Sequence, residues 1–508
     1  MSAYDANSGS GIGEQARRIA LFCVPTLVFL LITAYWRHKG NDHPTGDETF
    51  YLFVTESIID DVDVDVKNNL RKFGFLSADV HESQCIAGPH GWFSVHNLGL
   101  SALLAVPWAV RGVWGARLMM ALCCGLAAPV IYRGIHRTWQ CPQSSFMFSM
   151  ALALGMPLLH ACNQIYPDLP AGILLLFAAE RALAAEPAAR TVHWRDLLFP
   201  AALVLLPWLH IKYIAPAFIV LAWSLDATRD RRVLAHAAAL AVSLVVLAYY
   251  NAYAFGQVTG PYSDDGLLLC RNSLIVFLGL HFYQGQGMFL QQPLWLLGLI
   301  GLAPMWRSAR RSCLWWLLLY ASTVVPNSLH PNWYGGYSYL GRFGVTGALL
   351  WTIPLAYGAR MIFANGKTAP ALVAVLSLAL QIGLANHWLR ADSLEFGCAW
   401  PESIRDCHSA YPSFLKPYLP YWLPDANAWR YTANYAALIL AGGLLACGKF
   451  WQRRCICEPR RVLSTFQVRP ASKKTRWLGQ SISDASAPES PGRRPASAAT
   501  VSSFSEVE

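Results

Sequence analysis

Apolar runs recur along almost the whole chain and are separated by short polar segments. A helix needs about 20 apolar residues to cross the hydrocarbon core of a bilayer, and many runs approach that length. They predict an all-α polytopic membrane protein with about 12 transmembrane helices. The expected spans are 19–36, 114–133, 146–162, 168–186, 197–209, 213–225, 233–255, 291–306, 313–326, 343–362, 369–386 and 433–450.

Several of these runs are short, which indicates tilted or broken helices. The pair of runs that meets near 206–214 is the least regular. A further apolar segment, 95–110, is interrupted by Pro107. We expect this segment to be re-entrant or to lie along the membrane interface, since only then do successive arginine clusters fall on one side of the membrane.

Arginine placement orients the spans, because short cytoplasmic loops carry an excess of Arg and Lys. The clustered arginines are Arg17, Arg18, Arg133, Arg137, Arg181, Arg190, Arg195, Arg229, Arg231, Arg232, Arg307, Arg310, Arg311, Arg453, Arg454, Arg460 and Arg461. With all of them in the cytoplasm, both termini are cytoplasmic. The large outer loops are then 37–113, 256–290, 327–342 and 387–432, together with the short turns 162–167 and 210–212.

The organisation expected from this topology has three parts. Residues 1–18 form a cytoplasmic N-terminus, 19–450 the transmembrane domain, and 451–508 a basic, then Ser- and Pro-rich, disordered cytoplasmic tail. Arg17 and Arg18 precede the first apolar run, and no small-residue cleavage site follows it, so that run is expected to be an uncleaved signal-anchor. Such a protein belongs in a bacterial inner, or plasma, membrane.

Composition agrees with a membrane protein and excludes several classes. Hydrophobic residues make up 55% of the chain and charged residues 14%, whereas soluble domains carry about 25% charged residues. The net charge is +10, but there is no soluble domain to bind a nucleic acid. No GxxxxGK[ST] motif is present. An activated donor must therefore arrive through the membrane or on its far side.

Four of the 13 cysteines fall in outer loops: Cys85, Cys270, Cys398 and Cys407. Cys398 and Cys407 share one loop and would pair in an oxidising compartment, although two free thiols are an equal alternative. Zinc is less favoured, because no exposed CxxC pair is present.

The first outer loop opens with GDETFYLFVTESIIDDVDVDV, an acidic stretch in a basic chain. Residues 49–59 are predicted to form a helix whose polar Glu56 and Asp60 share one side. We expect it to lie along the membrane surface, with Asp47 and Glu48 at the level of the lipid headgroups. An anion at that depth needs a partner or a task.

The second half of the stretch, DDVDVDV, resembles a calcium loop only superficially. An EF-hand loop starting at Asp61 would need Gly and Glu where Val66 and Lys72 stand. The alternation of Asp and Val therefore predicts an edge strand or a solvated turn rather than a metal site.

Three acids are candidate catalytic residues: Asp47, Glu48 and Asp168. All three lie outside, at or near the start of a predicted helix. Such a position suits a general base that takes a proton from a hydroxyl or amine. The alternative is structural, since Asp at a helix start commonly accepts hydrogen bonds from the backbone.

Cationic and aromatic residues gather on the same side as candidate substrate-binding residues. They are His96, His210, Lys212, Tyr334 and Arg342. Lys and Arg beside aromatic side chains at an interface suit a lipid phosphate. The alternatives are interface anchoring for the aromatic residues, snorkelling for Arg342, and a structural hydrogen bond or metal ligation for His96.

The order of these motifs resembles the GT-C superfamily of membrane glycosyltransferases, which includes protein O-mannosyltransferases and the aminoarabinose transferases that act on lipid A. The motifs are GDETFYL, GARLMMAL at 115–122, Tyr166–Asp168, LPWLH and NWYGGYS. The nearest likeness is to a group of bacterial membrane proteins, over roughly residues 19–360. The Lys-Pro or Glu-Pro usual near the end of the first loop is replaced by His96–Asn97.

The resemblance implies transfer of a sugar from a polyprenyl-phosphate donor to a lipid, glycan or protein acceptor at the extracytoplasmic face, with inversion. It implies Asp47 as general base, Asp168 as a second acid, and Lys212 and Arg342 on the donor phosphate. Membrane lipids are further partners. The resemblance fixes no cofactor, and a divalent metal ion stays open. A lipid or solute transporter, or a glycan ligase or polymerase, is the alternative function.

Overall fold

The computed structural model describes residues 8–40, 43–72, 84–184, 197–228, 232–261, 269–330, 338, 341–363, 368–390, 411–423 and 428–456. Its α-helices are α1 (Ser8–His38), α2 (Asp47–Asp60), α3 (Lys67–Lys72), α4 (Leu98–Trp139), α5 (Pro142–Ala153), α6 (Leu158–Ala161), α7 (Asp168–Ala184), α8 (Leu198–Leu209), α9 (Ile214–Thr228), α10 (Arg232–Phe255), α11 (Arg271–Phe282), α12 (Met288–Gln291), α13 (Leu297–Ser308), α14 (Arg310–Leu329), α15 (Val345–Phe363), α16 (Thr368–Leu389) and α17 (Thr432–Ile456). Short 3-10 helices are η4 (Ile211–Tyr213), η5 (Pro293–Leu296), η6 (Arg342–Gly344), η8 (Ser413–Tyr418) and η9 (Ala428–Arg430). The strands are β1 (Cys85–Gly88) and β2 (Gly91–Ser94).

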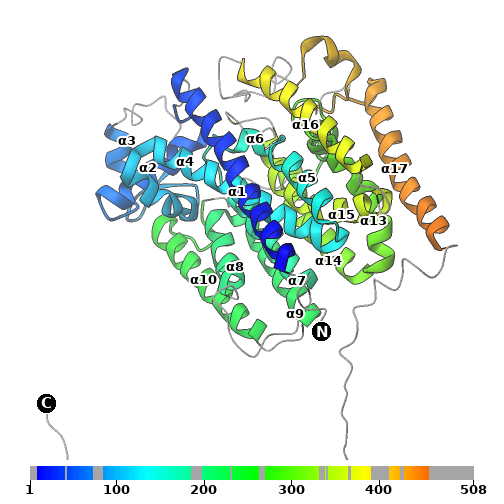
Figure 1. Ribbon diagram of the computed structural model, residues 1–508. Helices are drawn as coiled ribbons and strands as arrows, with labels where there is room; N and C mark the ends of the chain where they lie inside the picture. The colour runs from blue at the N-terminus through cyan, green and yellow to red at the C-terminus, as the bar shows by residue number, and fades with distance from the viewer. Residues whose placement is uncertain are drawn as a thin grey trace, which may run out of the picture. The chain divides into compact units, whose positions relative to one another are not determined.

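The all-helical membrane class is confirmed (Figure 1). In the described ranges, α1, α4, α10, α16 and α17 are long and apolar enough to cross a membrane, by length and composition. The other seven predicted spans coincide with helices that are shorter, broken or less apolar. The total of about 12 spans stays a prediction.

Helix α4 is bent where the sequence left a choice between a re-entrant and an interfacial segment. Its backbone leaves helical geometry at Arg111 (φ −146°) and Gly112 (φ 57°). The positive φ at Gly112 is in the left-handed region, which glycine adopts without a steric penalty. Residues 98–110 are thus a separate helical arm that joins the long apolar part of α4 at this bend.

The predicted span 146–162 is broken between α5 and α6. Backbone groups exposed at such a break need partners inside a membrane. The N–H of Met156 donates to the side-chain carbonyl of Gln381 on α16, at 2.8 Å. The amide of Gln292 in turn donates to the carbonyl of Ala151, at 3.0 Å. The buried side chains of Gln381 and Gln292 therefore supply hydrogen bonds to backbone groups at the break in the helix.

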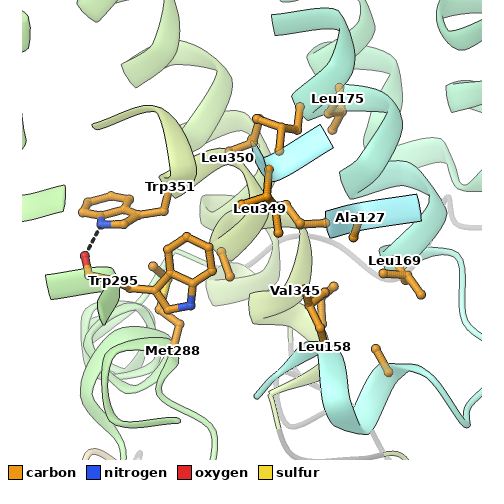
Figure 2. Close-up of a cluster of buried hydrophobic side chains, with 14 of the residues drawn as sticks. Ala127, Leu158, Leu169, Leu175, Met288, Trp295, Val345, Leu349, Leu350 and Trp351 are labelled. Atoms are coloured by element: carbon orange, nitrogen blue, oxygen red, sulfur yellow. Dashed lines mark hydrogen bonds between the residues drawn. The ribbon is translucent and has the colours of Figure 1, made fainter. Parts of the chain in front are cut away.

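The centre of the fold is formed by α13 and α15, with α7 and α4 against α15. In Figure 2, Leu350 lies towards Leu175 and Leu349 towards Ala127. The indole of Trp351 donates to the carbonyl of Trp295 at 2.7 Å. A Cβ added at Gly301 would lie 1.8 Å from the carbonyl oxygen of Pro354, so the two helices approach closely there. Small residues at such crossings are typical of membrane helices.

The first outer loop differs from the expectations at two points. Helix α2 forms where predicted, but its apolar side chains are buried in protein: Phe50 and Phe53 pack with Val66 and Leu70. The expected apolar side facing lipid is therefore covered by protein, and the position of the helix along the membrane surface stays a prediction.

The second difference concerns the strands. Residues 61–66 form a turn, which is one of the two alternatives that the sequence left open. The strands lie further on, where β1 and β2 pair antiparallel with Cys85 opposite Ser94. This hairpin was missed, because neither four-residue strand shows a clear alternation of apolar and polar positions.

Helix α7 separates two ends of the transmembrane unit. Asp168 is its first residue, and Glu180 lies about 18 Å further along the helix axis. At the Glu180 end, Arg133 pairs with the Glu180 carboxylate at 2.5 Å, and Arg137 donates to the Glu180 carbonyl at 3.2 Å. One of the arginine clusters assigned to the cytoplasm, Arg133 and Arg137, thus lies at the end of α7 opposite Asp168.

Candidate active site

The candidate site is built from four chain segments that lie far apart in the sequence. Asp47 is the first residue of α2, and Asp168 is the first residue of α7. Lys212 lies in η4, between α8 and α9, and Arg342 opens η6, just before α15. Each of these side chains thus stands where a loop enters a helix.

The four side chains form one continuous network of ion pairs. Arg342 bridges the two acids: its Nη1 lies 2.8 Å from Oδ2 of Asp47, and its Nε lies 3.2 Å from Oδ2 of Asp168. Lys212 Nζ lies 2.6 Å from the other oxygen of Asp168. Two carboxylates are therefore matched by two cations. We call Asp47, Asp168, Lys212 and Arg342 the four-residue site.

Aromatic side chains line the cationic part of the four-residue site. The guanidinium of Arg342 lies 3.8 Å from the centre of the Tyr166 ring. Lys212 Nζ lies 4.8 Å from the centre of the Phe343 ring. The hydroxyl of Tyr213 donates to Oδ1 of Asp168 at 2.9 Å. The sequence reading did not single out these three residues; their one signal is adjacency to the predicted acids and cations.

The members of the four-residue site differ in exposure. The Asp47 side chain is 22% exposed and that of Lys212 13%, whereas Arg342 is 6% and Asp168 2% exposed. Burial alone would raise the pKa of Asp47, but the adjacent Arg342 outweighs it and lowers that pKa to about 2. Burial lowers the pKa of Lys212, and the Asp168 carboxylate offsets part of the decrease. Asp47 is thus an ionised, partly accessible carboxylate at neutral pH.

His96 reaches Asp47 through another side chain. Gln84 donates from Nε2 to Oδ1 of Asp47 at 3.0 Å, and Oε1 of the same amide lies 3.2 Å from Nε2 of His96. The His96 ring stacks on Tyr51, with 4.5 Å between ring centres. Burial lowers the pKa of His96, so the ring is neutral at neutral pH. Gln84 is a connection that the sequence did not suggest.

His210 has a local role in the structure. Its Nδ1 accepts a hydrogen bond from the backbone N–H of Lys212, at 3.2 Å, which caps η4. Burial lowers the pKa of His210 well below its usual value. The ring therefore fixes the turn that carries Lys212. The fifth predicted substrate-binding residue, Tyr334, lies outside the described residues, as do Cys398 and Cys407.

Glu48, predicted as a catalytic acid, does not join the four-residue site. It is fully buried and pairs with Arg117 at 3.2 Å. Its carboxylate also accepts hydrogen bonds from the backbone N–H groups of Ile165, at 2.7 Å, and Thr45, at 3.0 Å. A carboxylate enclosed by these donors is not placed to take a proton from a substrate.

The described residues near the site do not fit a resident metal ion. Within the described ranges, no group of three or more His, Cys, Asp or Glu side chains could hold one. The positive guanidinium of Arg342 also stands between the two carboxylates. The Asp61, Asp63 and Asp65 side chains instead bond to neighbouring residues of their own loop.

Fold and site together define a class: a multi-pass helical membrane protein whose ion-paired carboxylates lie at the starts of two helices. No family model matches the chain, and no curated protein matches it. Two solved structures resemble it: crystal structures of ArnT from Cupriavidus metallidurans, in the apo state and bound to undecaprenyl phosphate.

The chain shares 14% identity and a TM-score of 0.46 with the apo ArnT structure, over 84% of this chain and 73% of that one. For the undecaprenyl phosphate complex the values are 16%, 0.42, 84% and 74%. At these identities and TM-scores, the matches carry no argument about substrate or residue roles.

Proposed function

We propose that the protein is a membrane glycosyltransferase that moves a sugar from a polyprenyl-phosphate donor to an acceptor hydroxyl or amine outside the cytoplasm. The observation that carries this proposal is the convergence of two carboxylates and two cations in the four-residue site. A phosphate leaving group needs cations beside it, and an attacking hydroxyl needs a base. The site holds both within one network.

In the proposed reaction, the Asp47 carboxylate takes the proton of the acceptor hydroxyl. The hydroxyl oxygen forms a bond to the anomeric carbon of the donor from the face opposite the phosphate. The bond from that carbon to the phosphate oxygen breaks, and its electron pair stays on the phosphate. Lys212 and Arg342 hold the polyprenyl phosphate product, and the configuration of the sugar is inverted.

The ion pairs supply a reason for donor binding to precede proton transfer. In the free protein Arg342 lies against Asp47 and keeps its pKa near 2, which makes the carboxylate a weak base. A donor phosphate competes for the same guanidinium. When Arg342 also pairs with the donor phosphate, it stabilises the Asp47 carboxylate less. The pKa of Asp47 then rises, and the carboxylate becomes a stronger base.

Asp168 supports the cations in this scheme. It is almost completely buried and accepts from Lys212, Tyr213 and Arg342. A carboxylate so enclosed keeps Lys212 and Arg342 charged and in place, while the more exposed Asp47 meets the acceptor. The proposed outer location is supported by the arginine-rich end of α7, which lies opposite Asp168.

The test combines purified protein with cells. Proteoliposomes containing the wild type should transfer labelled sugar from a member of an undecaprenyl-phosphate pentose and hexose panel into a lipid, glycan or protein fraction. Cells lacking the gene should lose the corresponding sugar from their envelope. Movement of the labelled lipid or sugar across the bilayer, with no new glycosidic bond, would instead establish the transporter alternative.

A further inference from the structure

Asp47, Gln84 and His96 are joined by hydrogen bonds, and these bonds determine which ring nitrogen of His96 carries the proton. The carboxylate of Asp47 is ionised and can only accept, so the amide of Gln84 must present its NH₂ group to Asp47. The amide oxygen then faces His96. Only a protonated Nε2 can donate to that oxygen, so in the neutral ring of His96 the proton is on Nε2 and Nδ1 carries a lone pair.

That lone pair has no partner in the described part of the chain. His96 is 8% exposed, and its Nδ1 makes no hydrogen bond. A buried acceptor without a partner is rare in folded proteins and costs stability. The ring lies beside the four-residue site, since only the Gln84 amide stands between Nε2 of His96 and the carboxylate of Asp47.

We propose that Nδ1 of His96 accepts a hydrogen bond from a substrate hydroxyl, and that Gln84 is the positioning residue that fixes both His96 and Asp47 for it. The inference rests on the proposed function and adds the atom that orients the reacting sugar or acceptor. The same amide that holds the proton on Nε2 of His96 also restrains Oδ1 of Asp47. The Gln84 side chain thereby fixes the positions of Nδ1 of His96 and of the Asp47 carboxylate relative to each other.

Two variants test this proposal. Gln84→Met removes both hydrogen bonds of the amide at nearly constant volume. His96→Phe keeps a ring to stack on Tyr51 and removes both ring nitrogens. The matched control is Gln292→Met, which removes an amide that is equally bonded on two sides, to Ala151 and Ser377, away from these residues. Monodisperse elution in detergent selects the folded protein for every measurement.

Binding of undecaprenyl phosphate, with and without a sugar, separates the two sources of a hydroxyl. The sugar-bearing probe is the panel member that the wild type prefers. If the hydroxyl belongs to the donor sugar, both variants should bind the sugar-bearing lipid about tenfold more weakly and plain undecaprenyl phosphate unchanged. If it belongs to the acceptor, both affinities should stay constant while transfer falls about tenfold or more.

Equal loss of affinity for both lipids, or unchanged affinity and transfer, would overturn the inference. So would an equal effect of Gln292→Met, since the loss would then be a general consequence of removing a buried amide. Failure of the wild type itself to bind either lipid or transfer sugar would refute the proposed function separately, because that result does not depend on the variants.

Discussion

Asp47 and Glu48 are neighbours in the sequence, yet the fold gives them opposite environments. Asp47 keeps a side chain 22% exposed and shares Arg342 with Asp168. Glu48 is fully buried, and its pair with Arg117 is closed on every side by protein. The first arrangement leaves part of the Asp47 carboxylate accessible. The second holds the scaffold together.

The Glu48–Arg117 pair also explains how the two acid-bearing segments are held side by side. Glu48 accepts from the N–H of Ile165, and Arg117 donates to the carbonyl of Asn163. These residues immediately precede Tyr166 and Asp168. A buried pair beside Asp47 therefore anchors the turn that presents Asp168. The lesson is that one acid of the GDE motif stands where the proposed chemistry can reach it, while the other holds the geometry of the site.

The largest effect is expected from Asp47→Asn. This change keeps the shape of the side chain but removes the proposed base, so transfer should fall by about 10²- to 10⁴-fold. The amount of monodisperse protein should stay near that of the wild type, because Asp168 still pairs with Arg342. Initial rates of sugar transfer in proteoliposomes measure the effect. Wild-type activity in this variant would refute Asp47 as the base.

Glu48→Gln should act on stability instead. It leaves the Arg117 charge buried without its partner, a change that costs about 3–5 kcal/mol. Apparent melting temperature in detergent and the yield of folded protein measure it. The double variant Glu48→Gln, Arg117→Met should recover part of the loss, since it removes both buried charges.

The matched control is Glu56→Gln in the same helix, whose partner Lys72 is 60% exposed and can rehydrate. A folded Glu48→Gln protein that has lost transfer as completely as Asp47→Asn would break the comparison, because both acids would then act in the chemistry.

A smaller effect on sugar transfer is expected from Arg342→Gln, and the pH dependence of kcat/KM measures it. Arg342 keeps the pKa of Asp47 near 2, below the usual value of 3.8. The stability gained from this carboxylate is therefore present above about pH 4 and lost as pH falls from about 4 to 2. For the same reason, kcat/KM of the wild type should show no acidic limb from Asp47 between about pH 4 and 7.

In Arg342→Gln, burial remains and the guanidinium is gone, so the pKa of Asp47 should rise from about 2. An acidic limb should then appear in the pH profile, together with a loss of donor affinity. Arg360→Gln is the control, since Arg360 bonds to the carbonyl of Thr138, outside the four-residue site. An unchanged pH profile in Arg342→Gln would show that the guanidinium does not control the base.

Much of the fold could be predicted from the sequence, because the apolar runs and arginine clusters are long, repeated signals. Helix α2 was correctly predicted, but the packing of its apolar side chains against other parts of the protein was not. Its segment Phe50–Val54 is apolar on all sides, which is typical of a helix buried in protein. Helix α11 was missed within an outer loop, since its 12 residues are too few for a span.

The site was predictable in its members and not in their pairing. Motif order and sidedness selected Asp47, Asp168, Lys212 and Arg342, and the structure brings these four together. Their catalytic and binding roles stay predictions. Gln84 carried no signal, because a single glutamine in a loop has no periodicity or motif. The burial of Glu48 depends on Arg117, 69 positions further along, which only the tertiary fold reveals.

The smallest effects are expected in DDVDVDV, the more conspicuous half of the acidic stretch. Asp65 accepts from the N–H groups of Lys67 and Trp92, both at 3.0 Å, so it joins the start of α3 to β2. Asp65→Ala should lower stability by about 1 kcal/mol, as loss of a helix cap does. Asp61→Asn, at an exposed position, should change stability by less than about 0.5 kcal/mol.

Thermal melting in detergent, with calcium and with chelator, measures both variants and tests the metal alternative together. Three carboxylates committed to neighbours in their own loop should give the same melting temperature in either condition. A calcium-dependent rise that Asp61→Asn abolishes would show that this segment holds a cation. The second half of the stretch would then be a metal site and not a connecting turn, beside a first half that carries the proposed base.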